Sequence, residues 1–209
     1  MDGHGGAAVA EFCQRSLEDL FTLCALNQTE QALKNLFVEL NTKTVNMREG
    51  STISVVCVLE SHDEVSVGVL GDSVVTVLDA KDNFHISPEH NVRSNLKERT
   101  AAKRRGGTYE DGYIFSADLS HGLQLSRALG DTDLGTILSR KPDIYTVKHP
   151  QWILLATDGL IDPGHDASSG PLKEVAEFAK KRATAEELME WAEKRGLLDN
   201  ATAIVWKRE

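Results

Sequence analysis

Carboxylates stand next to apolar, strand-like segments at several places in this chain of 209 residues. Strand ends are rigid, and a neighbouring glycine or asparagine lets the backbone turn sharply there. Carboxylates that converge from several strand ends form a site of hard oxygen ligands, which suits Mg²⁺ or Mn²⁺. Taken singly, each is better explained as an ordinary turn former, so the prediction rests on their number. The residues are Asp72 after VGVLG, Asp158 after WILLAT with Asp162 four residues later, and Asp199 before the segment ATAIVW.

The chain opens with MDGHGG, a dense cluster of special residues. Asp2 and His4 can together supply a metal ligand and a general acid. The glycines fit either a loop that cradles phosphate or a flexible remnant of a tag. A P-loop is excluded because no Gly-Lys-Ser/Thr follows them. The GxSxG and HExxH motifs of other hydrolases and the DxDx(T/V) motif of aspartyl-phosphate enzymes do not occur in the sequence.

The overall charge limits the class of partner. The chain has 23 Lys and Arg against 32 Asp and Glu, which gives a net charge of −9. A general nucleic-acid binder or a protein of anionic membranes needs a basic face, so we expect neither nucleic acid nor membrane as a partner. An anionic substrate held through metal cations is still compatible with this charge.

The sequence gives no sign of export or of a membrane anchor. No apolar run approaches the roughly 20 residues that span a bilayer, and the first residues lack the pattern of a signal peptide. Cys13, Cys24 and Cys57 are odd in number, have no CxxC spacing and lie in apolar surroundings, which is typical of buried free thiols. We therefore expect a cytoplasmic protein, with the nucleus as the open alternative.

The helices that must position these residues follow from the hydrophobic periodicity. The predicted helices are 7–27, 28–47, 91–107, 171–182 and 184–195. Gly106 and Gly107 stop the third of them. Thr184 and Glu187 have the spacing of a capping box at the start of the last.

Segments rich in valine and isoleucine predict strands. They are 51–60, 64–71, 73–80, 143–149, 151–158 and 201–207. The first three are expected to be antiparallel and joined by short turns, and their continuous valine runs indicate burial on both faces. The fourth and fifth are expected to pair through a turn at His149 and Pro150. Because helices and strands occur in runs and not in regular alternation, we expect one α+β layered domain over 1–209.

Read together, the motifs resemble those of the metal-dependent serine/threonine protein phosphatases of type 2C, the PPM family. Seven segments occur in the family's order from residue 2 to the C-terminus, which makes the resemblance highly specific. They are Asp2–Gly6 (DGHGG), Gly50–Thr52 (GST), Gly71–Ser73 (GDS), a helix running from Glu98 to the glycine pair Gly106–Gly107, Leu125–Asp131 (LSRALGD), Leu154–Leu160 (LLATDGL) and Asp199–Thr202 (DNAT).

The resemblance implies a fold and a site. The fold is a sandwich of two antiparallel β-sheets flanked by helices on both outer faces, and the site holds two Mn²⁺ or Mg²⁺ ions at one end. His4 would be the acid for the leaving group. Carried over residue by residue, the ligands would be the Asp2 carboxylate bridging both ions, the Gly3 carbonyl, and Asp158 and Asp199 on one ion, with Asp72 and Asp162 completing a third, weaker site.

The implied activity is hydrolysis of phosphoserine and phosphothreonine on proteins by a metal-activated water, with a phosphorylated protein as substrate. Family members carry a further segment before DGHGG, which supplies strands, an arginine that grips the phosphate and a glutamate that supports the metals. This sequence starts at Met1, so we expect an N-terminally truncated sandwich with exposed sheet edges, and a completing partner chain or self-association. The retained acidic residues favour the enzyme. The missing arginine and glutamate favour the alternative, a non-catalytic pseudophosphatase or scaffold that binds a partner protein through the same fold.

Overall fold

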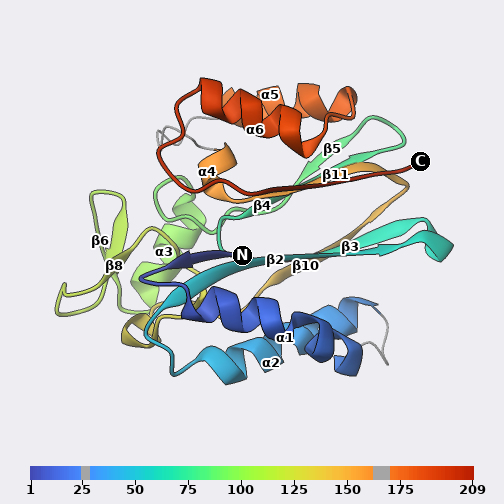
Figure 1. Cartoon of the computed structure of the whole chain (residues 1–209). Helices are drawn as coiled ribbons and strands as arrows, with labels where there is room; N and C mark the ends of the chain where they lie inside the picture. Colours follow the sequence, from blue (N-terminus) through green and yellow to red (C-terminus); the bar gives the residue numbers. More distant parts are fainter. Residues whose placement is uncertain (25–28, 162–169) are drawn as a thin grey trace.

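Two β-sheets face each other between two pairs of helices in the computed structural model of this chain (Figure 1). The structure describes residues 1–24, 29–161 and 170–209. Helices α1 (Ala8–Cys24) and α2 (Thr29–Thr44) cover one sheet, and α5 (Gly170–Lys180) and α6 (Ala185–Lys194) cover the other. This four-layer arrangement confirms the α+β sandwich expected from the sequence.

The sheets are built from antiparallel pairs. The first has the order β1 (Asp2–His4), β2 (Gly50–Leu59), β3 (Glu64–Leu70) and β10 (Asp143–Lys148), with β9 (Leu129–Gly130) also paired to β2. The second has the order β12 (Ala203–Lys207), β11 (Pro150–Ala156), β4 (Val74–Asp79) and β5 (Phe84–Ile86). A small third sheet holds β6 (Thr108–Glu110), β7 (Tyr113–Phe115) and β8 (Gly122–Leu123), and the remaining helices are α3 (Leu96–Arg104) and the short α4 (Asp158–Ile161).

Strands β3 and β4 are buried along nearly their whole length, as the continuous valine runs predict. One face of each points into the space between the sheets. The side chains that fill this space are mostly valines, whose branched Cβ packs well on a pleated surface. The cluster consists of Val65, Val67, Val69, Val75, Val77, Val147 and Ile153.

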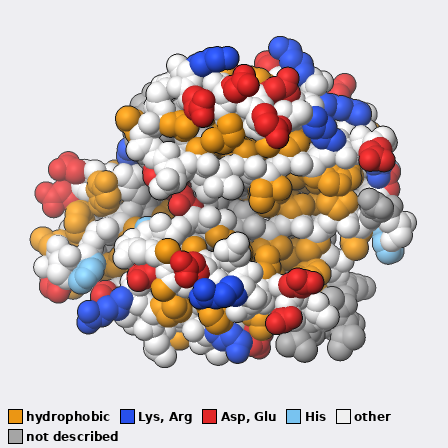
Figure 2. Space-filling model, in the orientation of Figure 1, with side chains coloured by type: hydrophobic (Ala, Val, Ile, Leu, Met, Phe, Trp, Pro, Cys, Tyr) orange, Lys and Arg blue, Asp and Glu red, His pale blue; other side chains and the backbone are white. Residues whose placement is uncertain are grey.

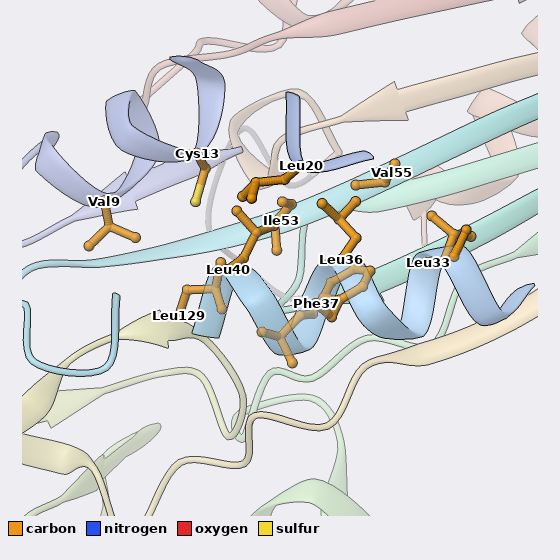
Figure 3. Close-up of a cluster of buried hydrophobic side chains, with 12 residues drawn as sticks. Val9, Cys13, Leu20, Leu33, Leu36, Phe37, Leu40, Ile53, Val55 and Leu129 are labelled. Atoms are coloured by element: carbon orange, nitrogen blue, oxygen red, sulfur yellow. The ribbon is translucent and has the colours of Figure 1, made fainter. Parts of the chain in front are cut away.

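A second core fixes α1 and α2 on the outer face of the first sheet (Figure 3). Val9 and Cys13 of α1 are fully buried there, and α2 contributes Leu33, Leu36, Phe37 and Leu40. The Phe37 ring lies directly over Gly68 of β3, where an added Cβ would approach the ring to 2.6 Å. Burying a leucine or phenylalanine stabilises the fold by about 1.5–3 kcal/mol, so this shared core holds α1 and α2 on the sheet.

Two of the predicted strand pairs are wrong. The β2–β3 hairpin is confirmed, but β4 does not pair with β3, and β11 does not pair with β10. At Gly71, with φ +112°, and at His149, with φ +53°, the chain crosses from one sheet to the other. A short polar turn looks the same in sequence whether it folds a strand back beside its neighbour or carries it to a facing sheet about 10 Å away.

The predicted helices are present, and one of them is shorter than expected. The segment 91–107 contains α3 from Leu96 to Arg104 only, because Asn95 caps it by accepting hydrogen bonds from the N–H groups of Lys97 and Glu98. The capping box of Thr184 and Glu187 at the start of α6 is confirmed. The junction between the first two predicted helices, residues 25–28, lies outside the described residues.

One edge of β2 is open. Strand β1 pairs with β2 only through Gly50–Thr52, and in the described ranges no strand covers the same edge from Ile53 onward. Two cavities of about 560 and 670 Å³ line this edge. The larger reaches from α1 across β2 to Ile204 and Trp206 of β12. Figure 2 shows hydrophobic side chains gathered across the middle of this face, between the two helical layers.

We expect this open edge to bind an apolar fluorescent dye. Ile204 lines the larger cavity with 58% of its surface exposed, so Ile204→Lys should cut the bound-dye signal by half or more. The matched control is Leu96→Lys, which changes a 67% exposed leucine outside both cavities. Light scattering over a concentration series measures self-association in the same samples. A stable monomer that binds no dye would contradict the expectation of an exposed apolar edge.

Candidate active site

Strand β1 carries two of the predicted residues. It pairs antiparallel with the start of β2, with Asp2 opposite Thr52 and His4 opposite Gly50. Side chains alternate along a strand, so Asp2 and His4 share one face. After β1 the chain turns through Gly5 and Gly6, both with positive φ, directly into α1. The opening cluster is therefore a strand and a tight turn of the fold, and its interpretation as a flexible remnant is wrong.

Two loops of the second sheet bring Asp158 and Asp199 together. Thr157 joins them: its N–H donates to the Thr202 carbonyl (3.2 Å), and its Oγ1 accepts the Thr202 N–H (2.9 Å). Gly159 lies so close to the second loop that an added Cβ would be 2.4 Å from the Asn200 carbonyl oxygen. Only glycine permits this approach, which explains the Asp-Gly pair at the end of β11.

The turn that holds Asp72 is hydrogen-bonded to the first sheet through Thr52 of β2. The Thr52 and Ser73 hydroxyls are 2.6 Å apart, and Thr52 Oγ1 also accepts the Asp2 N–H at 3.1 Å. The Asp72 carboxylate is buried and accepts a hydrogen bond of 2.9 Å from Asn91 Nδ2. These bonds place Asp72 at the same end of the sandwich as Asp2.

The four carboxylates act on one another. Burial raises the pKa of Asp2 to about 7, together with a hydrogen bond to Asp158 and the negative charges of Asp158 and Asp199. Burial and the charge of Asp158 likewise raise the pKa of Asp72 to about 7. Asp158 is half-buried and Asp199 is exposed. The crowding that the sequence predicts is therefore present at this end of the sandwich.

The donor set fits a divalent cation by its chemistry. Carboxylate oxygens are the ligands that Mg²⁺ and Mn²⁺ prefer, and a cation between carboxylates cancels their repulsion. Within the ranges that the structure describes, no three His, Cys, Asp or Glu side chains surround one point closely enough to hold a metal ion. Asp162 lies outside the described residues. The assignment of individual ligands, including the Gly3 carbonyl, stays a prediction.

The sequence motifs assign no role to three polar residues of this site. Asn91 contacts Asp72, Thr52 links Asp2 to Ser73, and Asp131 contacts His4 at 2.8 Å. Thr52 and Asp131 stand in the GST and LSRALGD motifs, so the signal was present for both. Asn91 lies outside every motif, and its contact depends on how the loop after β5 folds.

Comparison with known proteins identifies the family. The family model described as "Protein phosphatase 2C" matches residues 1–203. The chain is 26% identical over 221 residues to "Protein phosphatase 1K, mitochondrial" of Xenopus laevis, covering 98% of this chain and 58% of that protein. It is 30% identical over 219 residues to "Probable protein phosphatase 2C 56" of Oryza sativa subsp. japonica, covering 98% and 59%.

Solved structures show the same fold. The crystal structure of a serine-threonine phosphatase 2C from Toxoplasma gondii superposes with a TM-score of 0.60 and 25% identity, over 94% of this chain and 70% of that one. A C. elegans sex determining protein gives a TM-score of 0.74 over 98% of this chain and 54% of that one; at 21% identity it is evidence for the fold alone.

This chain belongs to the protein phosphatase 2C family, as its motifs predict. It spans about 58–59% of the length of the two curated relatives described above.

Among the helices of the described ranges, none combines the length and apolar character needed to cross a bilayer. The cytoplasmic location stays a prediction.

Gly159→Ala should destabilise the site end of the second sheet. The new Cβ would displace the Asn200 backbone, and overpacking of this kind costs about 1–3 kcal/mol of unfolding free energy. Urea unfolding measures the change. Gly135→Ala is the control, because Gly135 has φ −53° and an added Cβ there is no closer than 3.1 Å to its neighbours. Equal losses in the two variants would contradict the close approach at Asn200.

The raised carboxyl pKa values make the metal-free protein less stable as the pH rises. An aspartate in an unfolded chain has a pKa of about 3.9, so between about pH 4 and 7 the folded chain binds more protons than the unfolded one. The stability that protonated Asp2 and Asp72 contribute is complete below about pH 4 and is lost as the pH passes about 7.

Asp72→Asn imitates the protonated carboxyl at every pH. In EDTA, its free energy of unfolding should rise relative to wild type between about pH 5 and pH 8, by up to a few kcal/mol. Urea titrations across this range measure the difference. Asp82→Asn, in an exposed turn with φ +60°, is the matched control. A wild-type advantage that grows toward pH 8 would have the wrong sign.

Proposed function

We propose that this chain is a protein phosphatase that hydrolyses phosphoserine and phosphothreonine with the help of Mn²⁺ or Mg²⁺. The observation that supports it best is the convergence of Asp2, Asp72, Asp158 and Asp199, where burial and neighbouring negative charge raise the pKa of Asp2 and of Asp72 to about 7. Repulsion of this kind costs stability unless a cation compensates it. Membership of a family whose relatives are named protein phosphatases supports the same reading.

Two divalent ions at this end of the sandwich would supply a water of lowered pKa and would neutralise charge on the phosphoryl oxygens. Asp2, the Gly3 carbonyl, Asp158 and Asp199 would hold them. Asp72 and Asp162 would complete a third, weaker site. An acidic protein can in this way accept an anionic phosphoprotein.

The chain's own contribution to the reaction is orientation and proton transfer. Asp2 and His4 are fixed on one face of β1 by pairing with β2, so the ligand and the acid keep a constant separation. His4 would donate the proton that the serine or threonine oxygen needs as it leaves phosphorus. A positioned general acid contributes about 10²–10⁴-fold to such a step.

The comparisons do not support the non-catalytic scaffold that the sequence left as an alternative. The completing partner expected from the sequence stays a proposal. The open edge of β2 from Ile53 to Leu59 is the surface on which an added strand would pair with this chain.

Hydrolysis of a phosphothreonine peptide tests the function. We expect turnover with Mn²⁺, none with EDTA, and a loss of at least about 100-fold in kcat/KM for Asp158→Asn, since changes outside the ligand shell alone cost about 10–100-fold. Asp82→Asn removes a carboxylate from an exposed turn and should leave turnover unchanged. Wild-type protein that binds Mn²⁺ but gives no metal-dependent turnover would favour the scaffold instead.

A further inference from the structure

His4 and Asp131 form a contact between residues far apart in the sequence. His4 Nε2 lies 2.8 Å from Asp131 Oδ2. The Asp131 carboxylate is 9% exposed and the His4 ring 24% exposed, so the ring keeps one accessible side. We propose that Asp131 is a positioning residue that holds the His4 imidazole for proton donation to the leaving group. This inference rests on the proposed phosphatase function.

The backbone around Asp131 is built to hold its carboxylate in one place. Asp131 has φ +50°, a left-handed conformation that costs a non-glycine residue free energy. Its N–H donates to the Glu49 carbonyl at 3.0 Å. Gly130, also with positive φ, lies so close to Glu49 that an added Cβ would be 2.0 Å from that carbonyl oxygen. The strained backbone of this loop therefore places the Asp131 carboxylate beside His4.

Gly50 provides the space for the pair. A Cβ added at Gly50 would lie 2.1 Å from both His4 Nε2 and Asp131 Oδ2. The two side chains thus meet directly over bare backbone at the start of β2. Gly50 also pairs with His4 of β1 and with Gly130 of β9, so one residue sets the register of the strand that carries His4 and of the strand that ends just before Asp131.

Arg140 binds the backbone of the same loop. Its guanidinium donates hydrogen bonds to the carbonyls of Ala128 and Gly130. These bonds satisfy carbonyls that precede Asp131 in the chain. The pair is consequently held from three directions: by β2, by the Glu49 carbonyl and by Arg140.

A carboxylate at Nε2 fixes the ring. It accepts the Nε2–H, which leaves Nδ1 as the nitrogen that can face a substrate. In the proposed step, a water oxygen forms the new bond to phosphorus and the bond from phosphorus to the serine or threonine oxygen breaks. The departing oxygen keeps the bonding electron pair and takes the Nδ1 proton of the His4 imidazolium, which becomes a neutral imidazole that keeps its Nε2–H on the Asp131 carboxylate. The proton lost by the water returns to the imidazole or passes to solvent, so charge and protons balance.

Asp131→Asn is the variant of choice, because asparagine tolerates positive φ and only the charge is removed. Substrates whose leaving groups differ in basicity distinguish a loss of proton donation by His4 from a general loss of active-site structure. With a phosphothreonine peptide, whose alkoxide is a poor leaving group, kcat should fall by about 10–100-fold, and with p-nitrophenyl phosphate by less than about 3-fold. His4→Gln should show the same pattern. Asp133→Asn, two residues away in the same turn, should change neither rate. Equal losses on both substrates, or no loss, would overturn the proposal.

A second readout does not depend on activity. In metal-free protein labelled with ¹⁵N, the neutral form of the His4 ring should show the Nε2–H tautomer in wild type and in Asp133→Asn, and a mixture of tautomers in Asp131→Asn. Urea unfolding identifies any variant that fails to fold. A wild-type ring without tautomer preference would overturn the pairing, whereas absent turnover with a fixed tautomer would count against the phosphatase function alone.

Discussion

Repulsion among carboxylates at one end of the sandwich is the constraint on which the rest of this structure depends. Asp2, Asp72, Asp158 and Asp199 come from both sheets, and burial together with the charge of Asp158 raises the pKa of Asp2 and of Asp72. A flexible surface would let them separate. They stay together because rigid strand ends and short backbone hydrogen bonds fix where each loop goes. The stability given up here has to come from the buried valine layer and from the helices packed outside it.

The site is held by hydrogen bonds of small side chains and by close backbone contacts. Thr157 ties the two loops of the second sheet, and Thr52 ties β1 to the turn of Asp72. Glycines stand where two backbones must nearly touch, as at Gly159 and Gly130. None of these residues is large or charged. Their importance follows from the distances they permit, so substitutions that look conservative in sequence change the site most.

Features of the structure that depend on a local residue pattern could be predicted from the sequence. The period of the apolar residues located the helices and strands, and the motif order identified the family. Strand pairing could not, because the turns at Gly71 and His149 carry the chain between sheets and no local signal separates that path from a hairpin. The four converging carboxylates were predictable because motifs mark strand ends. The contact between His4 and Asp131 was not, since it joins residues 127 positions apart whose partnership exists only in the folded chain.

Because β1 is short, its local stability is coupled to ligand binding at the site. This strand has three residues and carries both Asp2 and His4, yet it pairs only with Gly50–Thr52 of β2. A strand held by only three backbone partners opens locally at a small free-energy cost, without global unfolding. Any ion or substrate that engages only the closed strand stabilises it by mass action. Protection of the amides of residues 2–4 from exchange is therefore expected to rise with ligand concentration.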